Sequence, residues 1–486
     1  MPILPSGHDG GQPAPGSGPG GLVLAPFRGV RYAADRISDL AGVTSPPYDV
    51  IAHDIEAQLI AADPHNIVRL ILPHAAGPPG GGRYDGAASA LRQWQDERVL
   101  VADPAPGLYV YEQARPDPGS SDGGRGEVLQ RGLIGGLGLR PPEDRVILPH
   151  EDVMPGPVTG RRELMEATQA NLEPIFLLYD GGRPPGAATQ VVEAVAAGGP
   201  PLAEALTEDG LRHRLWAVTD PAQLAAVAAD LAPRQALIAD GHHRYAAYRQ
   251  LQARRRDAGC GAGPWDYGLA LLVDSAAYPP RIGAIHRVLP GLTPDKAVDL
   301  AKGAFCVTPQ PGGSRDLAAA LAALDQAAVA GPAFLVAGAG PAENSATGSS
   351  ANGSSATGSS ATGSGANGSG TAYLLTDPDP VQAEAAMPDG LSATWRGLGY
   401  SVLQQLLITR LWGLRDDDRS VRIVHNDAAT AIAEAGKSGG TAVICAPMSA
   451  AEVYTVAANG ERVPRKSTSF GPKPRTGLVI RAFAES

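Results

Sequence analysis

The sequence has few cysteines, no long apolar run and no excess of basic residues. Its three cysteines, Cys260, Cys306 and Cys445, lie far apart and show no metal-ligand spacing, a pattern typical of reduced thiols in a cytoplasmic protein. No apolar run approaches the roughly 18 residues that a membrane-spanning helix needs, so we expect no membrane insertion. The formal net charge of −10 argues against non-specific nucleic-acid binding as the main activity.

Composition along the chain predicts its division into domains, and the length of 486 residues suggests two or three of them. Residues 1–21, rich in Gly and Pro, lack the features of a secretory signal and are predicted to form a disordered tail. We expect an N-terminal α/β core over residues 22–290 and a C-terminal α/β region over 291–486. Within the latter, residues 344–370 repeat small polar residues that bury no apolar area, so they are predicted to be a disordered insertion whose deletion is tolerated.

The pattern of apolar residues indicates a mixed α/β (α+β) fold with several domains. From residue 202 onward, strand-like runs such as LRHRLWAVT and YGLALLVD alternate with helical runs such as PAQLAAVAADLA. This alternation favours parallel pairing of the strands. Upstream, the runs GLYVYEQA and QRGLIGGLGL predict a hairpin, and NIVRLILP predicts a further strand.

One stretch, QALIADGHHRYAAY, carries the strongest chemical signal. The apolar run Ala236–Ala239 predicts a buried strand that meets Asp240-Gly241 just before a helical pattern over Arg244–Ala258. Gly241 permits a positive φ or the close approach of a ligand. Because the first N–H groups of a helix have no intrahelical partners, such a corner attracts anions.

Three side chains that can donate to phosphate, His242, His243 and Arg244, stand at this corner, and an arginine holds two phosphate oxygens with one rigid fork. We therefore interpret the segment from Asp240 to Arg244 as a phosphate-binding site. The alternatives are ordinary turn and capping chemistry with a solvated surface, or a metal site made by the two histidines and Asp240. The absence of an i, i+4 pair of histidines argues against the metal site.

Two loops carry candidate catalytic acids. Pro46-Pro47 restricts the backbone to extended geometry and presents Asp49, which either forms the wall of a site or orders the turn. His150 and Glu151 precede a helical run and are either general-base machinery or part of a polar loop. A second His-Arg pair, His286-Arg287, is open to the same two interpretations.

The loop near the C-terminus nearly matches a Walker A motif. Arg465 stands where that motif needs glycine, and the sequence continues into a Pro-rich loop and a strand, so a Walker fold is excluded. A basic group formed by Lys466, Ser467, Thr468 and Lys473 either donates to an anion from another architecture or is an ordinary surface loop.

Several segments in order resemble a known family. These are PFRGVRY, PPYDVI, HNIVRLILP, the His-Glu loop, PIFLLYD, ADGHHRYAA, the His-Arg pair before Leu-Pro, and PRKSTSFGPKPRTGL. Together they resemble the prokaryotic family catalogued as domain of unknown function 1015; the small-residue insertion departs from it. The DGHHR turn also resembles the phosphate-binding signature of the ParB/sulfiredoxin superfamily, which includes partition proteins, sulfiredoxin and kinases acting on free L-serine.

The second resemblance implies a ParB/sulfiredoxin-like core in which Gly241, His242, His243 and Arg244 form the phosphate loop. It further implies a small-molecule phosphotransferase of serine metabolism that converts free L-serine to O-phosphoserine with ATP, ADP or pyrophosphate. Arg244 and His243, helped by Mg²⁺, would compensate charge on the transferred group, and Asp49 or Glu151 would act on the hydroxyl.

The expected partners are a small-molecule substrate and a phosphate donor, with neither nucleic acid nor membrane, and the oligomeric state is left open. One alternative is a nucleotide-binding switch without metabolic turnover. Another is a metal-dependent hydrolase that uses His242, His243 and nearby acids.

Overall fold

The computed structural model describes residues 20–73, 82–117, 126–338, 370–417 and 419–485, and the chain divides into two compact units. The first unit comprises Met1–Arg281 and Phe470–Ser486, and the second comprises Ile282–Ser469. Most of the predicted tail (1–21) and nearly all of the predicted insertion (344–370) lie outside the described residues.

The observed division differs from the predicted boundary at residues 290 and 291 in two ways. The strand β14 (Ile285–Leu289) pairs with strands of the second unit, and the chain returns to the first unit from Phe470. Local composition does not reveal either feature, because both depend on pairing between distant segments.

The first unit is built on a nine-stranded mixed sheet with the order β6-β11-β8-β12-β5-β4-β10-β9, with β1 beside β5. Its strands are β1 (Leu24–Ala25), β4 (Leu108–Arg115), β5 (Glu127–Gly138), β6 (Ile147–Leu148), β8 (Ile175–Tyr179), β9 (Ala203–Leu206), β10 (Arg212–Val218), β11 (Ala236–Asp240) and β12 (Tyr267–Asp274). The predicted hairpin is confirmed by the antiparallel pairing of β4 with β5.

The expectation of parallel pairing is wrong for most neighbouring strands of this sheet. β12 runs parallel to β8, and β11 runs parallel to β6, but β11 is antiparallel to β8 and β10 is antiparallel to β4. The helix between β10 and β11 does not return the chain to an adjacent strand. Strand-helix alternation therefore gives the fold class here, but not the direction of pairing.

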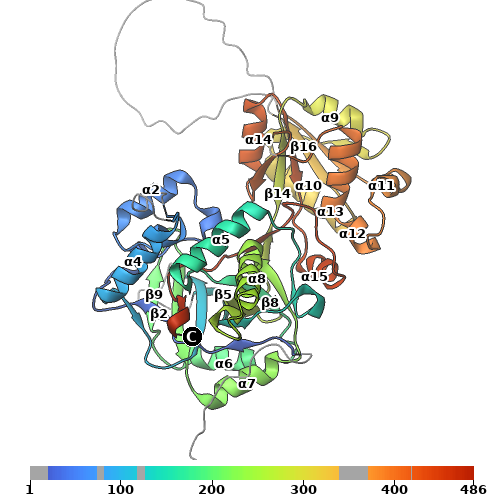
Figure 1. Cartoon of the computed structure of the whole chain (residues 1–486). Helices are drawn as coiled ribbons and strands as arrows, with labels where there is room; N and C mark the ends of the chain where they lie inside the picture. Colours follow the sequence, from blue (N-terminus) through green and yellow to red (C-terminus); the bar gives the residue numbers. More distant parts are fainter. Residues whose placement is uncertain (1–19, 74–81, 118–125, 339–369, 418, 486) are drawn as a thin grey trace, which may run out of the picture. The chain divides into compact units, whose positions relative to one another are not determined.

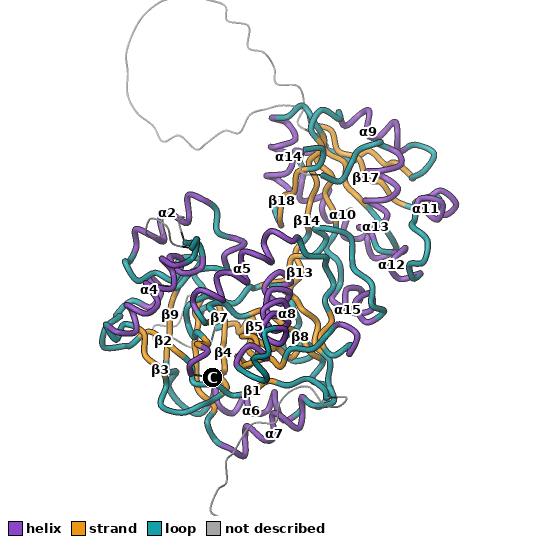
Figure 2. The backbone as a smooth tube through the Cα atoms, in the orientation of Figure 1, coloured by secondary structure: helices purple, strands orange, loops and turns teal. Residues whose placement is uncertain are grey.

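Helices surround the strands of each unit (Figure 2). In the first unit, α5 and α8 pack side by side, as Figure 1 shows. The helices of this unit are α1 (Leu40–Val43), α2 (His53–Ala62), α3 (Val68–Ile71), α4 (Asp85–Asp96), α5 (Pro155–Thr168), α6 (Ala187–Ala197), α7 (Pro221–Leu231) and α8 (His242–Asp257). Short strands β2 (Val30–Tyr32) with β3 (Leu100–Ala102), and β7 (Ala170–Asn171) with β21 (Arg481–Ala482), form two further ladders.

The prediction of a strand for NIVRLILP is wrong, because Val68–Ile71 of this segment forms helix α3. The side chain of Asn66 accepts a hydrogen bond from Val68 N at 2.9 Å and donates one to Gly42 O at 2.8 Å. The first of these bonds satisfies a backbone N–H at the helix start. A short apolar run by itself fits a buried helical turn as well as a strand.

The second unit is built on a six-stranded sheet with the order β15-β17-β16-β19-β14-β18, in which the paired strands are antiparallel. Its core includes Leu335, Ile444 and side chains of α10 and α14. The elements are α9 (Pro294–Ala301), β15 (Cys306–Pro309), α10 (Leu317–Ala330), β16 (Phe334–Gly338), β17 (Thr371–Thr376), α11 (Pro380–Ala386), α12 (Ala393–Gly397), α13 (Gly399–Val402) with a π-helical continuation (Leu403–Leu411), β18 (Arg422–His425), α14 (Ala428–Lys437), β19 (Thr441–Cys445) and α15 (Ala450–Ala458). None of the helices in the described parts of the chain has the length and apolarity needed to cross a bilayer.

Candidate functional site

The predicted strand-turn-helix corner is present in the first unit. β11 ends at Asp240, Gly241 adopts a left-handed conformation with φ of 93°, and α8 begins at His242, two residues before the predicted start. A Cβ atom on Gly241 would lie 2.9 Å from Ile175 Cγ2 and 3.1 Å from Arg244 Nε. Both the backbone and the tight surroundings therefore favour glycine at this position.

Arg244 is buried and bound to internal acceptors. Its Nη2 lies 2.5 Å from Asp240 Oδ2, and its Nη1 donates to the carbonyl of Pro174 at 2.6 Å. Burial acts to lower the pKa of Arg244, but Asp240 and Glu173 outweigh it and raise the pKa above its ordinary value. The guanidinium thus stays charged and fixes the orientation of the Asp240 carboxylate.

Lys473 joins the corner from the other end of the chain. Its Nζ lies 2.6 Å from Asp240 Oδ1 and 3.0 Å from Asp49 Oδ2. Burial acts to lower the pKa of Lys473, but the two carboxylates raise it above its ordinary value. For Asp49, burial acts to raise the pKa, and Lys473 with Arg244 reverses the shift so that the pKa lies below its usual range.

Accessibility differs sharply within this cluster of Asp49, Lys473, Asp240 and Arg244. The exposed side-chain fraction is 35% for Asp49 and 22% for Lys473, but only 9% for Asp240 and 4% for Arg244. The side chains of Asp49 and Lys473 are therefore the accessible part of the cluster, whereas Asp240 and Arg244 are buried.

Glu173, which sequence reasoning missed, supports the loop that carries Asp49. Its Oε1 accepts a hydrogen bond from Tyr48 N at 3.0 Å, and its Oε2 lies 3.6 Å from Arg161 Nη1. Burial raises the pKa of Glu173 despite the opposing effect of Arg244 and Arg161. An acid before an apolar strand is an ordinary strand start, so no local motif distinguishes it.

The two histidines of the corner hold a neighbouring loop. His242 Nε2 accepts a hydrogen bond from His150 N at 3.2 Å, and His243 Nε2 accepts one from Met154 N at 3.0 Å. Glu151 lies on this loop with its Oε2 3.9 Å from His242 Nδ1, and its side chain is 30% exposed. The start of α8 therefore orders the His-Glu loop beside the Asp49 and Lys473 cluster.

The predicted basic group near the C-terminus is divided between the units. Lys473 belongs to the first unit, whereas Lys466, Ser467 and Thr468 belong to the second. There the carbonyl of Lys466 accepts a hydrogen bond from Arg287 Nη2 at 2.9 Å, and Ser467 is fully buried. The contacts of Arg287 with backbone carbonyls indicate a role in holding this loop.

Sequence comparison places the chain in a family. Residues 24–350 match the family described as a protein of unknown function, DUF1015. The chain belongs to the DUF1015 family. No curated protein matches this DUF1015 chain in sequence.

Solved structures give distant matches to the DUF1015 chain. They include a free serine kinase in complex with AMP, at 12% identity with a TM-score of 0.31, covering 70% of this chain and 90% of the kinase. SbnI with a C-terminal truncation, from Staphylococcus aureus, matches at 11% identity with a TM-score of 0.32, covering 72% and 87%. A conserved hypothetical protein from Pyrococcus furiosus matches at 11% identity with a TM-score of 0.30, covering 70% and 94%. At this level the likeness assigns neither a substrate nor a site residue.

Proposed function

We propose that the first unit is a small-molecule phosphotransferase, which phosphorylates the hydroxyl of free L-serine with ATP, ADP or pyrophosphate. The observation that carries the proposal is the position of Lys473 between Asp49 and Asp240, at the corner where α8 begins. A partly exposed lysine side chain beside the positive end of a helix suits donor phosphates. A partly exposed carboxylate beside that lysine suits the acceptor hydroxyl. Free serine as the acceptor rests on the resemblance of the DGHHR turn.

Lys473 is the residue that we assign to the donor phosphates. Phosphoryl transfer needs compensation of the charge on the moving group, and a lysine supplies this as a point charge. Arg244 and His243 would contribute indirectly, because Arg244 binds Asp240 and His243 binds the backbone of Met154. Their contacts support positioning roles for both residues, with Gly241 and His242 completing the turn.

Asp49 is the residue that we assign to the serine hydroxyl. Lys473 keeps its carboxylate ionised, and its exposed fraction of 35% gives an acceptor access to it. In the proposed step, the bond from serine Oγ to phosphorus forms as the bond from phosphorus to the donor's leaving oxygen breaks. The hydroxyl proton passes to the carboxylate of Asp49. Glu151, beside His242, is the alternative base.

A phosphate donor is expected to bring Mg²⁺, which prefers hard oxygen ligands. Asp49 would supply one through its partly exposed carboxylate, because both oxygens of Asp240 are already paired with Lys473 and Arg244. No group of three or more His, Cys, Asp or Glu side chains with metal-binding geometry occurs within the described ranges, which suits an ion that takes its other ligands from phosphates and water. When bound, Mg²⁺ would neutralise charge on the donor phosphates.

Phosphorus NMR tests the proposal directly. The full chain is incubated with free serine, Mg²⁺ and ATP, ADP or pyrophosphate in turn, and the signal of O-phosphoserine is followed. Donor binding without product would favour the nucleotide-binding switch. Tightly bound zinc or iron in elemental analysis, with no phosphoserine, would favour the hydrolase.

A matched pair of variants connects activity to the cluster. Lys473→Met should abolish product formation, whereas Lys302→Met, which removes an exposed lysine of the second unit, should leave it unchanged.

A further inference from the structure

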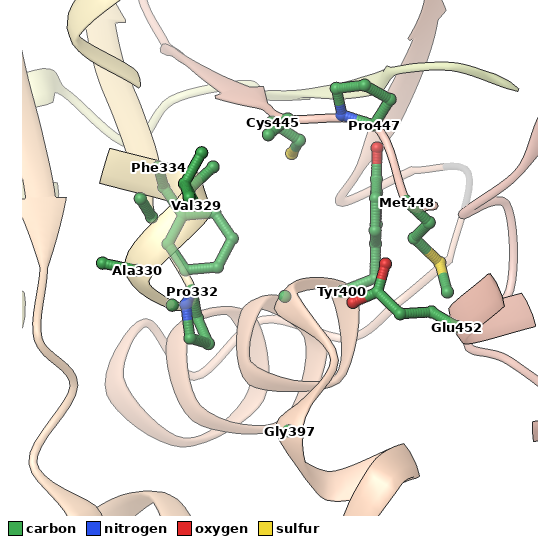
Figure 3. Close-up of a pocket in the computed structure, with 15 residues that line it drawn as sticks. Val329, Ala330, Pro332, Phe334, Gly397, Tyr400, Cys445, Pro447, Met448 and Glu452 are labelled. Carbon is green, nitrogen blue, oxygen red and sulfur yellow. The ribbon is translucent and has the colours of Figure 1, made fainter. Parts of the chain in front are cut away.

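The second unit contains a cavity of its own, with a volume of about 260 Å³. Its buried lining includes Phe334, Tyr400, Cys445 and Met448, whose exposed fractions are 2%, 2%, 4% and 5%. Figure 3 shows Phe334 and Val329 on one side of this space and Tyr400 and Met448 on the other. The cavity thus has a built wall of aromatic, thiol and thioether side chains.

One charged side chain lines the cavity and a second charge lies behind its wall, where the guanidinium of Arg287 is 5.6 Å from the centroid of the Tyr400 ring. Among the described residues that line the cavity, Glu452 is the only one of the types Asp, Glu, Lys, Arg and His. The last turn of α10 also lines the cavity, and Gly331, which follows this helix, makes no capping hydrogen bond through its N–H. A helix C-terminus carries partial negative charge on its unpaired carbonyls. Burial raises the pKa of Cys445 to about 12, so this thiol stays neutral.

Glu452 is held in place for binding. Its Oε2 accepts hydrogen bonds from Ser449 N and Ser449 Oγ, each at 2.7 Å, in a capping box at the start of α15. Both bonds use Oε2, which leaves Oε1 for a ligand. The ring of Phe334 adds a face that attracts a cation, whereas the ring of Tyr400 already contacts the guanidinium of Arg287.

We propose that this cavity binds a small organic cation, namely a primary amine with an apolar or aromatic body. The ammonium would be held by Glu452, and the body would lie between Phe334 and Tyr400. The volume of about 260 Å³ lies just below the usual range for ligand sites, so we expect a molecule smaller than a nucleotide. The proposal is independent of phosphotransfer in the first unit.

Calorimetric titration of the full chain with three probes of similar shape tests the proposal. We expect 2-phenylethylamine to bind at least about tenfold more tightly than neutral 2-phenylethanol, because a charge-assisted hydrogen bond replaces a neutral one. Anionic 3-phenylpropionate should bind most weakly. Equal affinity for the amine and the alcohol, tighter binding of the carboxylate, or no binding of the amine would overturn the proposal.

Two pairs of variants locate the binding. Glu452→Gln retains a residue that completes a capping box and should weaken the amine about tenfold without affecting the alcohol. Asp325→Asn, which removes an exposed acid from α10 outside the cavity lining, should have no effect.

The second pair adds a positive charge in place of an exposed valine. Val329→Lys, at the rim of the cavity, should repel the amine, whereas Val381→Lys on α11 should not; these valines are 89% and 74% exposed. Circular dichroism confirms folding of each variant. Indistinguishable amine affinities within either pair would refute this location.

Discussion

Replacing Lys473 with methionine should both destabilise the first unit and abolish its binding of a phosphate donor. The substitution keeps most of the side-chain volume but removes the ammonium that lies 2.6 Å from Asp240 and 3.0 Å from Asp49. Asp240 keeps its ion pair with Arg244, whereas Asp49 loses the cation nearest to it.

The expected loss of stability lies between the loss from breaking a buried ion pair and the loss from breaking an exposed one. Breaking a fully buried pair costs about 3–5 kcal/mol, and an exposed pair contributes about 0.2–1 kcal/mol. Lys473 is 22% exposed, and Asp49, at 35%, is screened further by solvent. We therefore expect the free energy of unfolding to fall by about 2 kcal/mol, which is roughly a thirtyfold change in the folding equilibrium.

Urea denaturation as a function of pH measures this loss and identifies its source. The folded-state pKa of Asp49 lies below its ordinary value, so its contribution is present above the ordinary Asp pKa and is lost as the pH falls through the lowered value. Without Lys473 the folded-state pKa of Asp49 moves back toward its ordinary value, so less stability is lost on acidification and the acid part of the profile should flatten. A double-mutant cycle with Asp240→Asn should show coupling.

Two results would refute this reasoning about Lys473. The first is a Lys473→Met variant with the stability, acid sensitivity and donor affinity of the wild-type chain. The second is a strictly additive double-mutant cycle, since that would mean that Lys473 and Asp240 do not interact in solution.

Three further predictions concern other parts of the chain. Gly241→Ala should lower the free energy of unfolding by about 1–3 kcal/mol, because φ is 93° at this position. Gly86→Ala in α4 should be neutral or stabilising, since a Cβ atom there meets open space. Thermal denaturation compares the two variants, and equal effects would contradict the assignment of backbone strain to Gly241. Burial and Arg475 lower the pKa of His213 from 6.5 to about 4, so its contribution to stability is present above pH 6.5 and is lost as the pH falls toward 4. His213→Gln should flatten the dependence of stability on pH between these two values. An unchanged dependence would contradict this role of His213. Glu173→Gln should reduce kcat for phosphoserine formation while the chain stays folded. The reason is that Gln retains an acceptor for Tyr48 N but loses the negative charge opposite Arg161. Steady-state kinetics tests this prediction, and an unaltered kcat would exclude Glu173 from the site.

Features encoded by neighbouring residues were predictable from the sequence. The turn at Asp240-Gly241 follows from an apolar run that meets glycine before a helical pattern, and the structure confirms the strand, the left-handed glycine and the helix. The β4 and β5 hairpin was local in the same sense. The mixed α/β class is likewise confirmed.

Features that depend on distant segments were not predictable in the same way. Lys473 and Asp49 are 424 residues apart in sequence, and only the folded chain pairs them. The corner was expected to present Arg244 to a phosphate, but its nearest partner is the carboxylate four residues earlier, Asp240. An i, i+4 pair of opposite charges is visible in the sequence, and it was the missed signal for this contact.

The formation of O-phosphoserine by the wild-type chain and by Asp49→Asn, followed by phosphorus NMR with each donor, tests the central claim most directly. We predict a phosphoserine signal from the wild-type chain with at least one donor, and a rate about 10²–10⁴-fold lower from Asp49→Asn. No phosphoserine from the wild-type chain with any donor, or an equal rate from the variant, would contradict the assignment of phosphotransfer to the Asp49 and Lys473 cluster.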